Sequence, residues 1–139
     1  MSVAMSVRLT SDVEASAESY MTQSGWNRTL LVNTALNEWL RIQAHPGIRF
    51  ISTPTGKRIA ALVNGPEIWT IAESWQQHNL SERTIDNLVQ ATGLEREEVD
   101  VALAYYADFK DEIDTEISIV HAAQEQAREA WERRQALHA

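Results

Sequence analysis

The residues from Ser2 to Leu9 alternate strictly between two kinds of side chain, and this pattern constrains the fold more than any other in the chain. In an extended strand one face would carry Val3, Met5, Val7 and Leu9, and the other would carry Ser2, Ala4, Ser6 and Arg8. A lone strand cannot satisfy its own ladder hydrogen bonds, and an open edge invites pairing with another chain. The alternation therefore predicts a strand that pairs with its copy in a second subunit.

Two helical patterns follow this strand. Apolar residues recur with helical spacing between Val13 and Met21, and Gly25 is placed to end that helix. Asn27 can cap a second helix, in which residues 31–42 carry an apolar stripe. Residues 1–43 are therefore predicted to form a unit of strand, helix and helix.

Three stretches of this unit carry a family resemblance: Ser6-Val-Arg-Leu-Thr10, Ser24-Gly-Trp-Asn-Arg-Thr29 and Thr34-Ala-Leu-Asn-Glu-Trp-Leu40. Together they resemble the CopG/MetJ/Arc-type ribbon-helix-helix DNA-binding proteins. The resemblance implies a β-α-α homodimer in which two paired strands enter the major groove of double-stranded DNA. It also implies that Ala4, Ser6 and Arg8 face the bases.

The three candidate base-reading residues differ in how well their side chains can recognise a base. Arg8 is the strongest candidate, because a guanidinium can donate to both O6 and N7 of guanine. Ser6 can bond to several base edges, whereas Ala4 offers only a methyl contact, for instance to thymine. The alternative for Arg8 is a solvated arginine on an exposed strand.

Phosphate contacts are expected at the start of the second helix. The free backbone N–H groups of Asn27, Arg28 and Thr29 form an anion site that the helix dipole strengthens, and the side chains of Arg28 and Thr29 can reach the same phosphate. Such contacts fix the register of a protein on DNA without reading sequence. A purely capping role for Asn27 is compatible with this one.

Charge is distributed unevenly along the chain. Residues 1–60 hold six Lys/Arg and four Asp/Glu, a net charge of +2, whereas residues 61–139 hold six and sixteen, a net charge of −10. The asymmetry indicates that the two halves face different partners. The alternative is that the acidic surface only keeps the protein in solution.

A second domain is predicted for residues 44–139, after the break at His45-Pro46-Gly47. Its strands Ile48–Ser52 and Lys57–Val63 form a hairpin. Helices are expected from Pro66, as the first helical residue, after Ser81 and near Glu95, followed by a long C-terminal helix. Hairpin, helix, glycine-containing turn and helix suggest a winged-helix-like domain, so the chain is predicted to be mainly α with short β. The acids of Glu95-Arg-Glu-Glu-Val-Asp100 argue against DNA contact in this domain.

Four strings in this domain carry a second resemblance: His45-Pro-Gly-Ile48, Gly56-Lys-Arg58, Gly65-Pro-Glu-Ile-Trp69 and the run from Ala102 to Phe109 with Asp111–Asp114. They are similar to the second domain of actinobacterial VapB-type antitoxins, which are encoded beside PIN-like ribonuclease toxins. The resemblance implies a ribonuclease toxin as partner. The carboxylates of Asp111, Glu112 and Asp114 suit a helix start better than a metal site.

The last helix carries a heptad-like stripe of residues spaced four and three apart, namely Ile113, Ile117, Val120, Gln124, Ala127 and Trp131. Its first half is expected to pack on its own domain. Its end, with Arg128, Trp131, Arg133 and Arg134, is a candidate partner-binding surface. A solvated helix face is the alternative.

No constellation in the sequence points to catalysis, a metal or a cofactor, because the four histidines are dispersed and the chain has no cysteine. We therefore expect a dimeric DNA-binding regulator, the antitoxin of a toxin–antitoxin pair that represses its own operon. The alternatives are a stand-alone repressor and a dimeric protein-interaction module that does not bind DNA. The N-terminus does not resemble a signal peptide and no apolar run could cross a bilayer, so a cytoplasmic location without membrane contact is expected.

Overall fold

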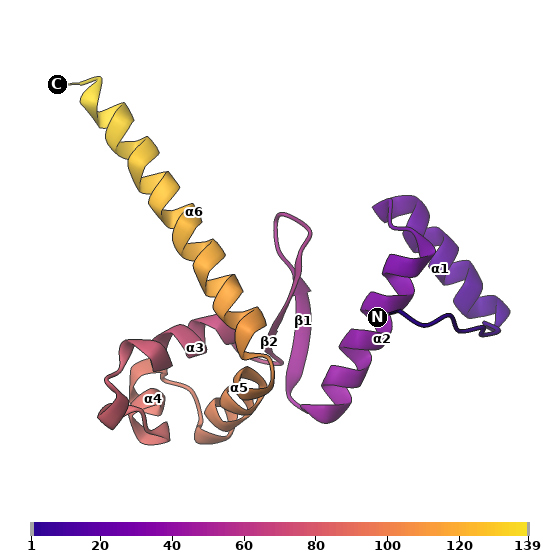
Figure 1. Ribbon diagram of the computed structural model, residues 1–139, viewed down its shortest axis with the longest axis horizontal. Helices are drawn as coiled ribbons and strands as arrows, with labels where there is room; N and C mark the ends of the chain where they lie inside the picture. Colours follow the sequence, from indigo (N-terminus) through magenta and orange to yellow (C-terminus); the bar gives the residue numbers. More distant parts are fainter. Residues whose placement is uncertain (1, 139) are drawn as a thin grey trace. The chain divides into compact units, whose positions relative to one another are not determined.

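The computed structural model describes residues 2–138 (Figure 1). In this range the chain forms six α-helices, one short 3₁₀ helix and a two-stranded antiparallel sheet. It divides into two compact units, Met1–Gln43 and Ala44–Ala139, which we call unit 1 and unit 2. Among the described helices, none combines the length and the apolar character that crossing a bilayer demands.

Unit 1 contains two helices, α1 (Ser11–Ser24) and α2 (Arg28–Ala44). The Thr10 side chain caps α1 by accepting a hydrogen bond from the backbone N–H of Val13 at 3.4 Å. Gly25 ends α1 in the left-handed conformation, with φ of 76°, as predicted. Both ends of this helix therefore follow from residues next to it in the sequence.

The strand predicted for the N-terminal segment is not formed. Residues 2–10 have no regular secondary structure and are all exposed. An extended segment needs a neighbouring strand for its backbone hydrogen bonds, and none lies beside it among the described residues. The element order begins with a helix, so the predicted β-α-α ribbon-helix-helix fold is wrong for this chain.

Unit 2 begins with the predicted hairpin. Strand β1 (Ile48–Ser52) pairs antiparallel with β2 (Arg58–Leu62), with Ile48 opposite Leu62 and Ser52 opposite Arg58. The turn between them contains Gly56 at φ of 86°, a conformation that glycine adopts without strain.

Helices α3 (Ile68–Gln77), α4 (Ile85–Thr92), α5 (Arg96–Asp108) and α6 (Lys110–Ala136) follow, with a 3₁₀ turn at Leu80–Glu82 between α3 and α4. The prediction that Pro66 is the first residue of a helix is wrong. The backbone N–H of Leu62 donates to the Pro66 carbonyl at 3.0 Å, and Glu67 forms an isolated antiparallel bridge with Ala61. These bonds keep the segment extended, and α3 starts at Ile68 with Glu67 as its N-cap.

The core of unit 2 lies between the hairpin, α3, α4, α5 and the first turns of α6. Its fully buried side chains include Ile48, Ile68, Ile71, Leu88, Val99, Tyr105 and Ile113. The ring of Tyr105 lies at its centre, with ring centroids 4.6 Å from Phe109, 5.3 Å from His45 and 6.5 Å from Phe50. Four helices and a hairpin are thus held by one contiguous apolar cluster.

Helix α6 is packed only near its start. Within it Ile113, Glu116 and Ile117 are buried, whereas the remainder runs away from the rest of unit 2 (Figure 1). The predicted apolar stripe therefore contacts its own domain in its first turns, and Trp131 at the other end is 54 % exposed.

Candidate nucleic-acid interface and partner-binding surface

The three candidate base-reading residues lie in the N-terminal segment. Ala4, Ser6 and Arg8 are all exposed. Within the part of the chain that the structure describes, Arg8 has no hydrogen-bond or ion-pair partner. Its guanidinium is therefore available to a ligand, although no secondary structure of this chain fixes its position.

The second candidate element, the start of α2, is organised by Asn27. Its side-chain Oδ1 accepts a hydrogen bond from the backbone N–H of Leu30 at 2.8 Å, so Asn27 caps the helix. Arg28 and Thr29 occupy the first turn, where backbone N–H groups have no carbonyl within the helix to donate to. These N–H groups at the start of α2 can donate to an external acceptor.

The Arg28 side chain is directed to two carboxylates of α1. Its Nη1 and Nη2 donate to Glu14 at 3.1 and 2.8 Å, and Nη2 also donates to Glu18 at 3.1 Å. The hydrogen bond from Arg28 lowers the pKa of Glu14, and the same bond raises the pKa of Arg28. A phosphate could reach the guanidinium only by competing with these carboxylates.

The net charges differ when they are counted over the two units instead of over residues 1–60 and 61–139. Residues 1–43 hold three Lys/Arg and four Asp/Glu, a net charge of −1, and residues 44–139 hold nine and sixteen, a net charge of −7. The positive balance of residues 1–60 depended on three cations of the hairpin, Arg49, Lys57 and Arg58, which belong to unit 2. Two of these support the hairpin itself: Arg49 donates to the Leu62 carbonyl at 2.8 Å, and Arg58 donates to the Ser52 hydroxyl at 3.1 Å.

The apolar side chains of unit 1 are uncovered. None of the described residues 2–43 is buried. The large apolar side chains exposed in this unit are Val3, Met5, Val7, Leu9, Val13, Tyr20, Leu30, Val32, Leu36, Trp39 and Leu40. Soluble monomers seldom expose so many apolar side chains close together in one small region.

In the candidate partner-binding surface at the end of α6, some arginines form ion pairs and others do not. Arg128 is held by Glu125 and Glu132 of the same helix. The hydrogen bond that Arg128 donates to Glu125 raises the pKa of Arg128 and lowers the pKa of Glu125. Arg133 and Arg134 have no ion-pair partner in the described range.

A polar cluster that was not predicted joins α3, α5 and α6. Asp114 accepts hydrogen bonds from Tyr106 at 2.6 Å, Gln76 at 2.8 Å and Lys110 at 2.6 Å, and Gln76 also donates to the Tyr106 hydroxyl at 2.7 Å. From the sequence, Asp114 is expected only to place a negative charge at the start of a helix. Nothing in the sequence near Asp114 indicates that it joins three helices, because Gln76 is 38 residues away.

The ionisation of this cluster follows its hydrogen bonds. Burial alone would raise the pKa of Asp114, but the bonds from Lys110, Tyr106 and Gln76 outweigh burial and lower it. Burial, followed by the bond to Asp114, raises the pKa of Tyr106. The cluster therefore holds a charged carboxylate at neutral pH, and it fixes the direction in which α6 leaves the domain.

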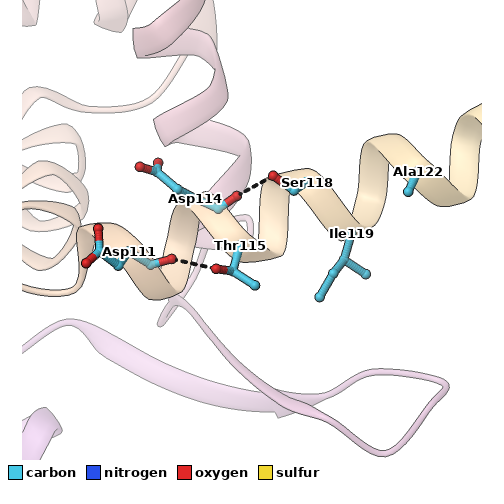
Figure 2. A pocket seen from close by; sticks show the side chains of 6 residues that line it. All are labelled: Asp111, Asp114, Thr115, Ser118, Ile119 and Ala122. Carbon is cyan, nitrogen blue, oxygen red and sulfur yellow. Dashed lines mark hydrogen bonds between the residues drawn. The ribbon is translucent and has the colours of Figure 1, made fainter.

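Asp114 also borders a shallow depression on the outer surface of α6. Its lining residues are Asp111, Asp114, Thr115, Ser118, Ile119 and Ala122, which lie on successive turns (Figure 2). Within residues 2–138 no group of three or more His, Cys, Asp or Glu is arranged to hold a metal ion.

Two of the dispersed histidines form pairs across unit 2. His45 Nε2 lies 2.8 Å from Asp108 Oδ2, and its ring packs on Tyr105 and Phe109. His121 of α6 pairs with Glu73 of α3. Both pairs join residues far apart in sequence.

Comparison with models of protein families, with curated proteins and with solved structures found no match to this chain.

Proposed function

We propose that this protein is a homodimeric DNA-binding regulator, in which unit 1 mediates dimerisation and DNA contact and unit 2 binds a partner protein. One observation carries the proposal: the described part of unit 1 has no buried residue, although it exposes many large apolar side chains. A second copy is the partner that every molecule of this chain has available. Burial of these side chains between two copies would supply the missing core.

DNA contact is assigned to the residues around this interface. Arg8 is exposed and without a partner among the described residues, and it is chemically suited to guanine. The capped start of α2, with Asn27, Arg28 and Thr29, offers backbone N–H groups to a phosphate. Two copies would present both elements twice, which suits a two-fold symmetric operator.

The partner of unit 2 is proposed from the resemblance to VapB-type antitoxins. In this proposal the protein is an antitoxin, it represses its own operon in the cytoplasm, and the free end of α6 binds a ribonuclease toxin. Trp131 supplies an exposed aromatic anchor, and Arg133 and Arg134 supply cations for an acidic surface.

A dimeric module that does not bind DNA is the second candidate. The net charge of −1 on residues 1–43 favours it, as does the engagement of Arg28 by Glu14 and Glu18. A surface without excess positive charge gains little from releasing the counterions of DNA.

One experiment separates the two candidates. The full chain is titrated with labelled DNA from upstream of its own gene at two salt concentrations. A DNA-binding regulator should lose affinity steeply with salt, with a logarithmic slope of about −0.9 per neutralised phosphate. Arg8→Ala should weaken binding to the specific site by about 1–3 kcal/mol for each arginine contact and reduce sequence preference.

Lys57→Ala is the matched control, because it removes one positive charge from unit 2 and should leave sequence preference unchanged. If the wild-type chain forms dimers but shows no salt-dependent binding to this DNA, the module without DNA function is the correct reading.

A further inference from the structure

The arginine at the start of α2 is bound by two carboxylates of α1. Glu14 and Glu18 lie one turn apart, so their side chains project from the same face of α1. Three of the five N–H donors of the Arg28 guanidinium are used: two donate to the two oxygens of Glu14, and one donates to Glu18. The contact with Glu14 has the two-point geometry with which an arginine also binds phosphate. The carboxylates therefore take donors that a phosphate would need.

These ion pairs are open to competition. The side chains of Arg28, Glu14 and Glu18 are 49 %, 40 % and 62 % exposed. Exposed ion pairs are weak, because water screens the charges and two flexible side chains must be held in place. Glu14 and Glu18 therefore occupy Arg28 in the free protein, but another anion can replace them.

The backbone next to this guanidinium offers further donors. The N–H groups of Arg28 and Thr29 lie in the first turn of α2, where no carbonyl of the same helix accepts from them, and the helix dipole favours negative charge there. The two carboxylates supply that negative charge in the free protein. As long as they stay in place, they repel an approaching phosphate.

We propose that Glu14 and Glu18 are internal competitors for the phosphate site at the start of α2, and that DNA binds there by displacing them from Arg28. This inference rests on the proposed DNA contact of unit 1, and it adds the regulation of that contact. Arg8 has no partner among the described residues, whereas Arg28 must exchange one set of acceptors for another. The exchange lowers the affinity for every DNA sequence, so complexes that lack base contacts are lost first.

The test removes the competitors and leaves the arginine. In the full-length Glu14→Gln/Glu18→Gln variant, affinity for labelled DNA from upstream of the gene should rise about threefold for each Arg28 that contacts it, or about tenfold for a dimer. Asp12→Asn/Glu38→Gln is the matched control, because it also removes two negative charges from unit 1, at residues that do not bond to Arg28. The control should give a smaller rise, and equal gains in the two variants would overturn the competition.

A second background separates competition for Arg28 from general repulsion of DNA. In an Arg28→Ala chain, Glu14→Gln/Glu18→Gln should raise the affinity no more than the control does. A gain that persists in full without Arg28 would overturn the proposal. Glu18→Gln alone removes one of the three hydrogen bonds and should give a smaller gain, and it replaces the double variant if circular dichroism shows that the double variant has lost helix.

Inorganic phosphate provides a readout that does not depend on DNA. In nuclear magnetic resonance spectra of the full chain, the backbone N–H signals of Arg28 and Thr29 should shift at a lower phosphate concentration in Glu14→Gln/Glu18→Gln than in the wild type. If the wild type binds upstream DNA but the variant gains no affinity over the control, the competition is wrong and the proposed function stands. If no chain binds DNA, the proposed function fails; the phosphate titration then supports the competition if the variant shifts first and overturns it if the two titrations are equal.

Discussion

Units 1 and 2 both consist largely of amphipathic helices, yet they differ in what covers the apolar faces. In unit 2 the predicted face of α3 is packed, with Ile68, Ile71 and Ala72 almost completely buried. In unit 1 the corresponding face of α2 carries Trp39 and Leu40, and both remain exposed. Hydrophobic spacing therefore identifies which face of a helix needs cover, but it does not identify the molecule that supplies the cover.

The number of elements explains the difference. Unit 1 has two helices of 14 and 17 residues, which can shield only one side of each other. Unit 2 surrounds Tyr105 with four helices and a hairpin, and such layers can enclose a core. Small assemblies bury a small fraction of their surface, and two helices alone leave the apolar side chains of unit 1 exposed.

Among the tests of this comparison, Tyr105→Ala in unit 2 should have the largest effect on the free energy of unfolding. The Tyr105 side chain is fully buried, so its removal should lower the free energy of unfolding by about 3–5 kcal/mol. Tyr20→Ala in unit 1 is the control, because Tyr20 is exposed and contacts Trp26 edge-on. Denaturant unfolding followed by circular dichroism measures both. Equal losses would mean that unit 1 has a packed core of its own.

Leu40→Ser should act on association rather than on folding of unit 2. Leu40 is 61 % exposed in one chain, and burial of a leucine contributes about 1.5–3 kcal/mol. A homodimer loses two leucines, so the dimer Kd should rise by about 100-fold or more. Leu80→Ser is the control, since Leu80 is 81 % exposed on unit 2. Sedimentation velocity over a concentration series measures the effect, and an unchanged Kd would argue against dimerisation through α2.

Two glycines with positive φ provide a test in which we expect a loss of stability of intermediate size. A Cβ at Gly47 would lie 3.3 Å from Val101 Cγ1, whereas a Cβ at Gly25 would meet nothing within 4 Å. Both alanine variants incur backbone strain of about 1–2 kcal/mol, and Gly47→Ala adds a steric cost against the core. Thermal unfolding should therefore show the lower midpoint for Gly47→Ala, and the reverse order would contradict the packing of residue 47 on α5.

The smallest expected effect is that of Asp114→Asn, at about 1–2 kcal/mol, because it weakens the charged hydrogen bonds that join α3, α5 and α6. The lowered pKa of Asp114 means that its contribution is complete above the usual aspartate range. It should be lost as the pH falls below about 4. Unfolding of wild type and variant should thus converge in acid, while the exposed control Asp111→Asn should show no such convergence.

Much of the local structure was predictable from neighbouring residues. Gly25 ends α1 and Asn27 caps α2, because each acts through a bond to a residue at most four positions away. The hairpin followed from two strand-like runs on either side of a turn, and the buried face of α3 followed from helical spacing. The helix start at Pro66 was predicted wrongly, because a bond from Leu62 holds that segment extended.

The sequence predicted which residues belong to the candidate site, but it did not predict their conformation or their partners. Ala4, Ser6 and Arg8 were identified as a potential strand face, but the chain by itself forms no strand there. Arg28 was assigned to phosphate, and the structure places it on Glu14 and Glu18. The choice of partner for a charged side chain depends on which helices meet, and that information is absent from the spacing within one helix.

The amino-acid sequence alone determined the end of α1, the cap of α2, the hairpin and the apolar face of α3, because caps, backbone preferences and periodicity act over a few residues. The tertiary structure decided which of those faces are covered, which carboxylates hold Arg28, and that Asp114 connects three helices. Burial and ion pairing depend on segments distant in sequence, and their free energies are gained only when those segments come together.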